Sequence, residues 1–330
     1  MNNSPLVSVV ILTYNSQTLQ RCIKSIGKTT YKNIEVILVD NGSKNDIYSF
    51  LKKELSHVNI QYIKNSRNVG HSEGFNIGFR VANGKYIMKV DDDVELDRSC
   101  IENLVTYLQS NPDVAAAQPL ILHKENGQYL YVGSIFLDVL GYSHPILDIS
   151  NKKTFYAAGA AFMIRKKVVV QASFEGCFFD PDYFIYYDEL DACWRLRLAT
   201  GLDIHVVYSA KAYHNPIKKG TYARYMYFYT RNRLMTLLKN HTTGNLIKWL
   251  PIVIFLDIIR MLILLLTDPE SGFAILRGLE WNLLNLKKNL KKRTIVQHML
   301  KKCLTKNSTI PMVKINLLES YRVFKEQLKH

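Results

Sequence analysis

Short apolar runs alternating with helical stretches constrain the fold of this 330-residue chain most strongly. The run from Val7 to Tyr14 is rich in β-branched residues and almost continuously apolar, which is typical of a strand buried on both faces. Further strands are predicted at 34–39, 60–63 and 86–90, with amphipathic helical stretches between them. The alternation predicts βαβ units, and therefore an α/β fold with a mostly parallel central sheet flanked by helices.

After about residue 115 the pattern is less regular. Residues 155–165 predict a strand with small residues at its centre, and residues 184–197 predict an acidic turn that leads into a helix. Residues 204–207 predict a short strand that ends before His214. The composition changes near Asn215, so we place a boundary there: a catalytic domain at 1–215 and a basic, apolar helical region at 216–330.

Polar residues follow three of the predicted strands directly. Ligands of parallel sheets bind beyond the carboxyl ends of the strands, so these residues are the first candidates for a site. They are Thr13, Tyr14 and Asn15 after the first strand, Asp40, Asn41, Gly42 and Ser43 after the second, and Asp91, Asp92 and Asp93 after the fourth.

The three adjacent aspartates need compensation, because neighbouring carboxylates repel one another. A hard divalent cation on oxygen ligands provides it, whereas a solvated acidic turn is the simpler alternative. An EF-hand is a poor explanation, since Leu96 stands where that loop requires glycine. His214 would complete a metal site only if the fold returns it to the triplet; a lone histidine is otherwise more often a packed or surface residue.

A second acidic group, Asp188-Glu189-Leu190-Asp191, begins the helix predicted after residue 184. Carboxylates at a helix start cap free N–H groups, and we expect at least one of the three to do so. Another could serve as a general base for a substrate hydroxyl. The glycines near Gly70 and Gly74 fit neither a P-loop nor a dinucleotide-binding fingerprint, which argues against a dehydrogenase.

The net charge of +15 is unevenly distributed. Residues 1–214 carry 22 basic and 22 acidic side chains, and residues 215–330 carry 21 and 6, so the whole excess lies in the last third. A basic, apolar tail on a neutral body indicates attachment to an anionic surface rather than binding of nucleic acid. Five scattered cysteines favour a reducing compartment, and the N-terminus does not resemble a signal peptide.

The stretch 249–266 is apolar apart from Pro251, Asp257 and Arg260, and its 18 residues border on the length of a membrane span. Two charges near the middle would be costly in hydrocarbon, although they could pair with each other. An interfacial helix, a spanning helix and the core helix of a soluble dimer all remain open. Leucines repeat at steps of 3 and 4 through 276–290 beside a lysine-rich face, which favours an interfacial position over a coiled coil.

Taken in order, these segments resemble the family 2 glycosyltransferases of GT-A (Rossmann-like) fold, especially rhamnosyl- and galactofuranosyl-transferase-like members. The matching pieces over residues 7–240 are VSVVILTYN, VILVDNGS, NVGHSEGFNIGF, GKYIMKVDDDVEL, YAAGAAFMIR, FIYYDELDACWRLR, AYHNP and YFYTRNRLMTLLKN. The resemblance implies an inverting transfer from a nucleotide-diphosphate-sugar of UDP or dTDP type, aided by Mn²⁺ or Mg²⁺.

The resemblance also assigns roles to residues. It places the donor nucleotide among Thr13, Tyr14, Asn15, Asp40, Asn41, Asn68, Gly70, Asp91 and Asp92, the metal on Asp91, Asp93 and His214, and the acceptor near Gly159, Ala160 and Trp194. Family members usually read E-D-x-D where this chain has Asp188-Glu189-Leu190-Asp191. By position the base is Glu189, Asp188 is the alternative, and Asp191 belongs to the same catalytic group.

We therefore expect a hexosyl- or rhamnosyl-type glycosyltransferase of polysaccharide biosynthesis in the cell envelope. It would act on a lipid-linked or saccharide acceptor. We expect the protein to be attached peripherally or monotopically to the cytoplasmic face of the cell membrane. We expect no nucleic-acid partner, and the sequence leaves open whether the protein forms a homo-oligomer. One alternative is a polyprenyl-phosphate sugar synthase, whose phosphate acceptor needs no general base. Another, from a different class, is a catalytically inactive membrane-bound scaffold of the same fold.

Overall fold

The computed structural model describes residues 4–125, 128–146, 149–215 and 220–304. Residues 305–330, part of the predicted C-terminal region, lie outside this description. The described chain forms two compact units that interleave along the sequence. The sheet unit is drawn from 1–135, 145–184 and 202–217, and the helical unit from 136–144, 185–201 and 218–330. The domain boundary that we place at residue 215 is a boundary along the sequence, and it stays a prediction.

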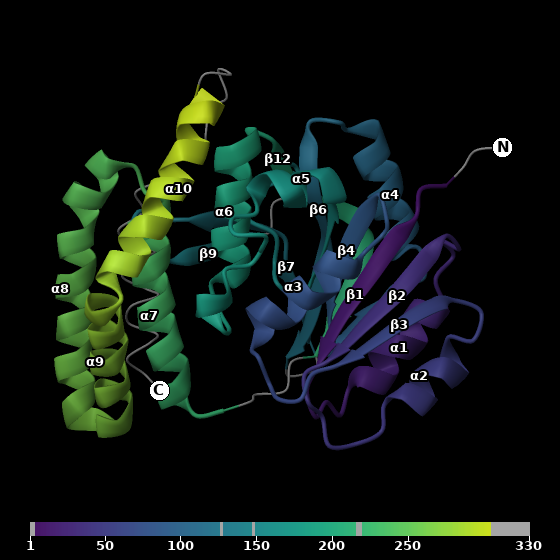
Figure 1. Ribbon diagram of the computed structural model, residues 1–330, viewed down its shortest axis with the longest axis horizontal. Helices are drawn as coiled ribbons and strands as arrows, with labels where there is room; N and C mark the ends of the chain where they lie inside the picture. The colour runs from purple at the N-terminus through teal and green to yellow at the C-terminus, as the bar shows by residue number, and fades with distance from the viewer. Residues whose placement is uncertain (1–3, 126–127, 147–148, 216–219, 305–330) are drawn as a thin grey trace. The chain divides into compact units, whose positions relative to one another are not determined.

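Ten strands of the described chain form one sheet, in the order β10-β12-β6-β11-β4-β1-β2-β3, with β5 beside β12 and β7 beside β6 (Figure 1). These strands are β1 (Val7–Thr13), β2 (Ile34–Asp40), β3 (Asn59–Lys64), β4 (Tyr86–Asp91), β5 (Val94–Leu96), β6 (Val114–Glu125), β7 (Gln128–Val132), β10 (Lys153–Thr154), β11 (Ala161–Arg165) and β12 (Asp203–His214). A separate two-stranded sheet pairs β8 (Ser134–Leu137) with β9 (Ser143–Ile146).

The predicted central sheet is confirmed, and its first half is parallel throughout: β3, β2, β1 and β4 all run the same way. The second half is mixed, because β11 enters antiparallel between β4 and β6. The strand predicted at 155–165 is shorter than expected and covers only β11, whereas the strand predicted at 204–207 extends to His214 in β12. The longer β12 follows from alternating burial, with Ile204, Val206, Ala210 and Ala212 inside.

Helices cover both faces of the sheet. The helices of the sheet unit are α1 (Leu19–Gly27), α2 (Tyr48–Glu54), α3 (His71–Val81), α4 (Cys100–Ser110), α5 (Lys166–Ala172) and the short 3₁₀ helix η1 (Pro181–Tyr183). Val7, Val9 and Ile11 of β1 share one core with α1, α2 and α4. The opposite face of β1 takes α3, whose Gly74 and Gly78 come so close that an added Cβ would meet Leu12 and Val10. Continuously apolar strands are thus explained by burial on both faces.

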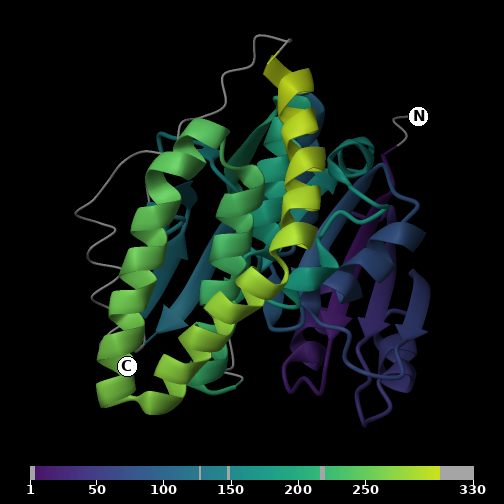
Figure 2. The ribbon, with the colours of Figure 1, turned by 60° about the vertical axis from the view of Figure 1, so that its left-hand side comes forward.

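The helical unit consists of five described helices. They are α6 (Asp188–Thr200), α7 (Tyr222–Asn240), α8 (Thr243–Thr267), α9 (Pro269–Leu284) and α10 (Leu286–Leu304). Helices α7 to α10 lie alongside one another and are green to yellow in Figure 2. Thr221, Thr242 and Asp268 cap the first turns of α7, α8 and α9 through their side-chain oxygens, which explains where these three helices begin.

Candidate functional site

Parallel pairing brings the predicted polar strand ends together at one edge of the sheet. Thr13 stands opposite Asp40 in the β1–β2 pair, and Leu12 stands opposite Asp91 in the β1–β4 pair. Thr13 Oγ1 donates a hydrogen bond to Asp92 Oδ2 at 2.8 Å, so the ends of β1 and β4 are also linked through side chains. This edge is where a doubly wound sheet binds its ligand.

Asp40 is fully buried at the end of β2. Its Oδ1 accepts the backbone N–H of Ser43 at 2.7 Å, and its Oδ2 accepts the Tyr62 hydroxyl at 2.8 Å. Burial raises the pKa of Tyr62 and the bond to Asp40 raises it further, so the phenol stays protonated and donates. These contacts hold the carboxylate in place, and its predicted contact with the donor base stays a prediction.

Asn41 ties the loop between β3 and α3 to this edge. Its Nδ2 donates to Asn68 Oδ1 and to the carbonyl oxygen of Gly70, each at 3.0 Å. Gly70 has φ +91°, and a Cβ there would meet Phe184, so only glycine fits this approach. Tyr14, 42% exposed, and Asn15, at φ 48°, continue from β1. All the predicted donor residues therefore lie in the sheet unit.

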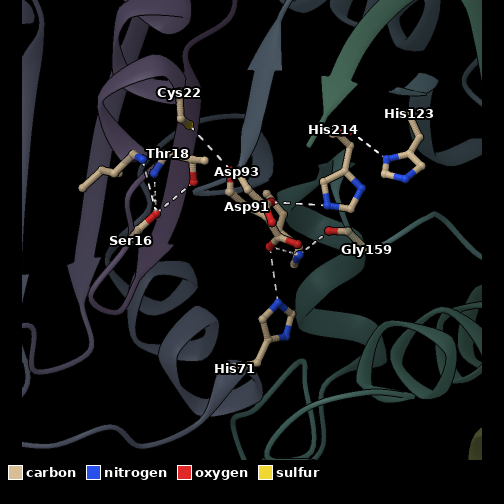
Figure 3. A network of polar contacts seen from close by, with 11 residues as sticks. Ser16, Thr18, Cys22, His71, Asp91, Asp93, His123, Gly159 and His214 are labelled. Atoms are coloured by element: carbon tan, nitrogen blue, oxygen red, sulfur yellow. Dashed lines mark hydrogen bonds and ion pairs between the residues drawn. The ribbon is translucent and has the colours of Figure 1, made fainter. Parts of the chain in front are cut away.

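The acidic triplet turns between β4 and β5, and the fold does return His214 to it. β5 pairs antiparallel with the end of β12, which sets His214 opposite Val94. His214 Nε2 then lies 3.3 Å from Asp93 Oδ1, while the backbone N–H of Asn215 donates to the Asp93 carbonyl at 3.1 Å. Figure 3 shows His214 and His71 approaching Asp93 and Asp91 from two sides. The length of β12 therefore brings His214 to Asp93, 121 positions earlier in the chain.

Lys89 is a member of this site that the sequence reasoning missed. It is fully buried on β4, and its Nζ donates to Asp91 Oδ1 at 2.7 Å and to the carbonyl oxygen of Gly159. The ammonium also lies 4.3 Å from the centre of the Phe75 ring. A lysine inside the apolar run 86–90 was the available signal, since a buried cation requires a partner.

His71, at the start of α3, was also missed. Its Nε2 lies 3.3 Å from Asp91 Oδ1. Burial raises the pKa of Asp91, but Lys89 and His71 outweigh burial and hold that pKa below its ordinary value. Asp91 is therefore ionised, and it already has a buried cation as counter-charge.

The chemistry of the triplet fits a divalent cation. Asp93 Oδ1 is buried and accepts no hydrogen bond from any residue that the structure describes. Carboxylate oxygens together with one imidazole nitrogen form a suitable ligand set for Mg²⁺ or Mn²⁺. Asp91, Asp93 and His214 are the residues that would hold the ion.

The predicted acceptor residues divide between the units. Gly159 and Ala160 belong to the sheet unit, and their backbone carbonyls reach the metal site. The Ala160 carbonyl accepts the backbone N–H of Asp91 at 2.9 Å, and the Gly159 carbonyl accepts a hydrogen bond from Lys89 Nζ. Trp194 belongs to the helical unit, where it is buried edge-on against His241 with 5.1 Å between ring centres. The structure thus assigns Trp194 a packing contact within its own unit.

The second acidic group begins α6 in the helical unit. Tyr186 and Tyr187 precede it at φ 67° and 66°, a conformation that non-glycine residues rarely adopt and that often marks a functional loop. Asn232 of α7 holds this loop, because its Nδ2 donates to the carbonyls of Ile185 and Tyr186 at 2.7 and 2.8 Å. The strained turn fixes the direction in which α6 starts.

The three acids of α6 differ in burial. Asp191 is fully buried and held by Arg195 at 3.0 Å, Lys239 at 3.0 Å and Asn240 at 2.8 Å, which ties α6 to α7. Asp188 is also fully buried, whereas Glu189 is half-buried. Of the three, Glu189 has the surface that a group accepting a proton from a substrate needs.

Comparison with known proteins decides the family. Residues 8–171 match the family model described as glycosyl transferase family 2. The chain belongs to this family. An uncharacterized glycosyltransferase of Haemophilus influenzae is 35% identical over 164 residues, which cover 47% of this chain and 50% of that protein. The putative colanic acid biosynthesis glycosyl transferase WcaA of Escherichia coli is 28% identical, over 71% of this chain and 83% of its own.

Solved structures support the fold of this family 2 member. GalNAc-T7, solved with UDP, GalNAc and Mn²⁺, matches 70% of this chain and 48% of its own at a TM-score of 0.56 and 18% identity. The mannosyltransferase PcManGT of Pyrobaculum calidifontis, solved with GDP-Man and Mn²⁺, matches 93% of this chain and 88% of its own at a TM-score of 0.53 and 16% identity. At such identities the likeness shows the GT-A fold alone. The match to the Haemophilus relative spans half of that protein's length.

Proposed function

We propose that this protein is an inverting, metal-dependent glycosyltransferase that moves a sugar from a nucleotide-diphosphate-sugar to a hydroxyl of a lipid-linked or saccharide acceptor. One observation carries the proposal. Asp91, Asp93 and His214 gather at the edge of the sheet where Thr13 and Asp40 also end, in a chain of glycosyltransferase family 2. UDP with Mn²⁺ in GalNAc-T7, and GDP-Man with Mn²⁺ in PcManGT, support a nucleotide-sugar donor and a metal.

Each group has a definite task in this proposal. A bound divalent cation would supply positive charge for the departing diphosphate. Lys89 and His71 keep Asp91 ionised and oriented. Glu189 would take the proton of the acceptor hydroxyl as its oxygen attacks the anomeric carbon. A single displacement with one base and no enzyme nucleophile inverts the anomeric centre, by the logic that separates inverting from retaining glycosidases.

Calorimetric titration tests the donor site. UDP, dTDP and GDP are titrated into the wild type and into Asp93→Asn, each with and without Mn²⁺. We expect one nucleotide to bind with Mn²⁺, and Asp93→Asn to weaken that binding at least about tenfold through loss of a charged ligand. Glu95→Gln is the matched control, because Glu95 lies two residues away on β5 and pairs with Arg21 at 3.6 Å. If Asp93→Asn and Glu95→Gln both bound the nucleotide equally well with and without Mn²⁺, this result would contradict the proposed metal site.

Substitution of Glu189 separates the proposal from its two alternatives. We expect Glu189→Gln to bind donor and metal normally but to lose about 10²- to 10⁴-fold in turnover, the usual contribution of a general base. Sugar transfer that survives this change would favour a polyprenyl-phosphate sugar synthase, whose acceptor phosphate is already ionised. A wild type that binds no nucleotide with Mn²⁺ would favour the inactive scaffold.

We also propose that the helical unit attaches the enzyme to the cytoplasmic face of the cell membrane, peripherally or monotopically. Among the described residues α8 alone is long and apolar enough to cross a membrane. Its Asp257 and Arg260 point inward and pair with each other and, for Asp257, with Arg233 of α7 at 2.5 Å. α8 also exposes a set of large apolar side chains, namely Ile247, Ile252, Ile254, Phe255, Ile258, Leu262, Ile263 and Leu266.

Buried charges together with an exposed apolar face support an interfacial helix rather than an isolated span. On α10, Lys287, Lys288 and Lys291 are exposed, which suits anionic lipid. Lys292 is buried, and Arg293 donates to the carbonyls of Leu238 and His241. A second copy of the chain is the competing occupant of the apolar face, and a homo-oligomer would then follow.

A further inference from the structure

The helical unit contains a pocket of about 560 Å³ between α7 and α9. Ligand sites commonly have about 300–1,000 Å³. Ala223 and Ala274 contribute to its floor and belong to a buried cluster with Met226 and Ile275. None of the residues lining this pocket has a task in the transfer reaction proposed above.

The aromatic wall of the pocket is fixed in position. Its rings are Tyr227 and Trp281. The buried guanidinium of Arg231 lies 5.4 Å from the Tyr227 ring centre and 4.8 Å from that of Trp281, within the range of cation–π attraction. Asn282 Nδ2 donates to the Arg231 carbonyl at 3.0 Å and so joins α9 to α7 beside this wall. The rings are therefore in place before a ligand arrives.

The charged lining is balanced. Arg224 and Arg277 bring two guanidinium groups to the pocket, and Glu270 and Glu280 bring two carboxylates. Glu270, Arg277 and Glu280 form no ion pair within the part of the chain that the structure describes. A ligand with only negative charge would meet both carboxylates, and one with only positive charge would meet both guanidiniums. The lining is complementary to a ligand that carries one charge of each sign.

The rim of the pocket is apolar. Leu284 lines the pocket and is 78% exposed, and Phe273, Leu276 and Leu283 of the same helix are exposed as well. A ligand held here by its polar end would therefore have apolar surface beside it. Exposed apolar groups of this extent mark contacts with lipid or with another apolar partner.

We propose that this pocket binds the headgroup of a zwitterionic phospholipid, a phosphate diester joined to an ammonium. Arg224 and Arg277 take the phosphate, for which guanidinium geometry is well suited. Glu270 or Glu280, which stand at different heights on α9, takes the ammonium. The acyl chains lie along the apolar side chains of α9. This inference rests on the proposed attachment of the helical unit to the membrane and adds a specific lipid class to it.

The test uses dihexanoyl phosphatidylethanolamine below its micelle concentration, with dihexanoyl phosphatidylglycerol as the purely anionic comparison. Binding to the full chain is followed by calorimetry. We expect saturable binding of phosphatidylethanolamine and at least about tenfold weaker binding of phosphatidylglycerol. R224Q/R277Q and E270Q/E280Q should each weaken binding of phosphatidylethanolamine at least about tenfold, since each removes the charges that pair with one end of the headgroup. K52Q/K53Q removes two exposed charges of the sheet unit and should leave the affinity unchanged.

Three results would overturn the inference: equal affinity for the two lipids, an equal loss in K52Q/K53Q and R224Q/R277Q, or O-phosphoethanolamine without chains binding as tightly as the lipid. The first two indicate general surface charge, and the third a site for a small soluble zwitterion. Titration of the same variants with UDP, dTDP and GDP in the presence of Mn²⁺ shows whether they are folded. The same titration separates failure of the lipid site from failure of the donor site.

Discussion

At the scale of single residues, Lys89 is the least ordinary member of the site. A fully buried ammonium is costly unless its donors are satisfied, and here Asp91, Gly159 and the Phe75 ring surround it. The lysine supplies one positive charge to a cluster of three carboxylates before any metal binds. Part of the repulsion within the triplet is therefore relieved by the protein itself.

Removal of this charge should make the protein depend more on metal. We expect Lys89→Met to lower the free energy of unfolding by about 3 kcal/mol without metal, because it leaves Asp91 with less counter-charge. Mn²⁺ should restore more stability to the variant than it adds to the wild type. Denaturant unfolding with and without Mn²⁺ measures both effects. Lys85→Met, which removes an exposed lysine four residues earlier, is the control. Equal unfolding of the two variants would contradict the role given to Lys89.

Residue patterns predicted the strand ends well but not the contacts that complete the site. Thr13, Asp40 and Asp91 could be placed together because parallel strands end at one edge. Lys89 and His71 escaped detection, since their roles depend on three-dimensional proximity to Asp91, and Lys89 also lies within an apolar run. His214 was a conditional candidate from the sequence and was assigned to the metal only through the resemblance. Its approach to Asp93 depends on the β5–β12 pairing, which local periodicity does not reveal.

At the scale of elements, the end of α7 holds a titratable group in the interior. His241 is 2% exposed, lies against Trp194 of α6, and contacts the Val139 carbonyl through Nε2 at 3.1 Å. Burial lowers the pKa of His241 to about 4, and Arg293 contributes in the same direction. The imidazole is therefore neutral at physiological pH, and its Nε2–H donates to the carbonyl.

This depressed pKa predicts a loss of stability in mild acid. The unfolded chain binds a proton on His241 near pH 6.5 and the folded chain only near pH 4, so stability falls as the pH drops through this window. The loss should reach roughly 3 kcal/mol. His241→Gln keeps an N–H donor without the titration, so its unfolding free energy should change less between pH 7 and 4.5. Denaturant unfolding at both pH values measures this, and identical pH profiles would contradict the assignment.

Sequence periodicity was less informative for α8 than for the strands. The stretch 249–266 left three interpretations open because hydropathy does not say which way the two charges point. Their burial against Arg233 depends on packing between the consecutive helices α7 and α8, which brings residues 24 positions apart into contact. Two charges three residues apart on a helix can share one face, and this spacing alone was consistent with the pairing that the structure has.

At the scale of the whole molecule, the division of charge seen in the sequence corresponds to a division of surface chemistry. The sheet unit carries the acidic site, and the helical unit carries the exposed apolar side chains of α8 and α9 and the lysines of α10. A soluble protein rarely leaves a large continuous apolar area open to water. The exposed apolar side chains of the helical unit therefore support the membrane attachment proposed above.

Vesicle flotation tests this proposal. We expect the wild type to float with vesicles that contain phosphatidylglycerol, and Phe255→Ser with Leu262→Ser to weaken binding at least about tenfold, since burial of each side chain contributes about 1.5–3 kcal/mol. The matched control is Ile149→Ser with Val170→Ser, two exposed apolar residues of the sheet unit. The proposal would be contradicted if the wild type did not float with the vesicles. If the wild type then sedimented as a dimer and the Phe255 and Leu262 variant as a monomer, the apolar face would instead bind a second copy of the chain.

The inward direction of Asp257 and Arg260 has a practical consequence for protein engineering. Leucine at these two positions would make α8 more apolar by hydropathy. The buried Arg233 guanidinium would then have no counter-ion, because Asp257 supplies it. Phe255, Leu262 and Leu266 are exposed, so glutamine or glutamate in their place would disturb no buried contact. A version of this enzyme that can be handled without detergent therefore needs new residues on the outer side of one helix and an untouched inner side.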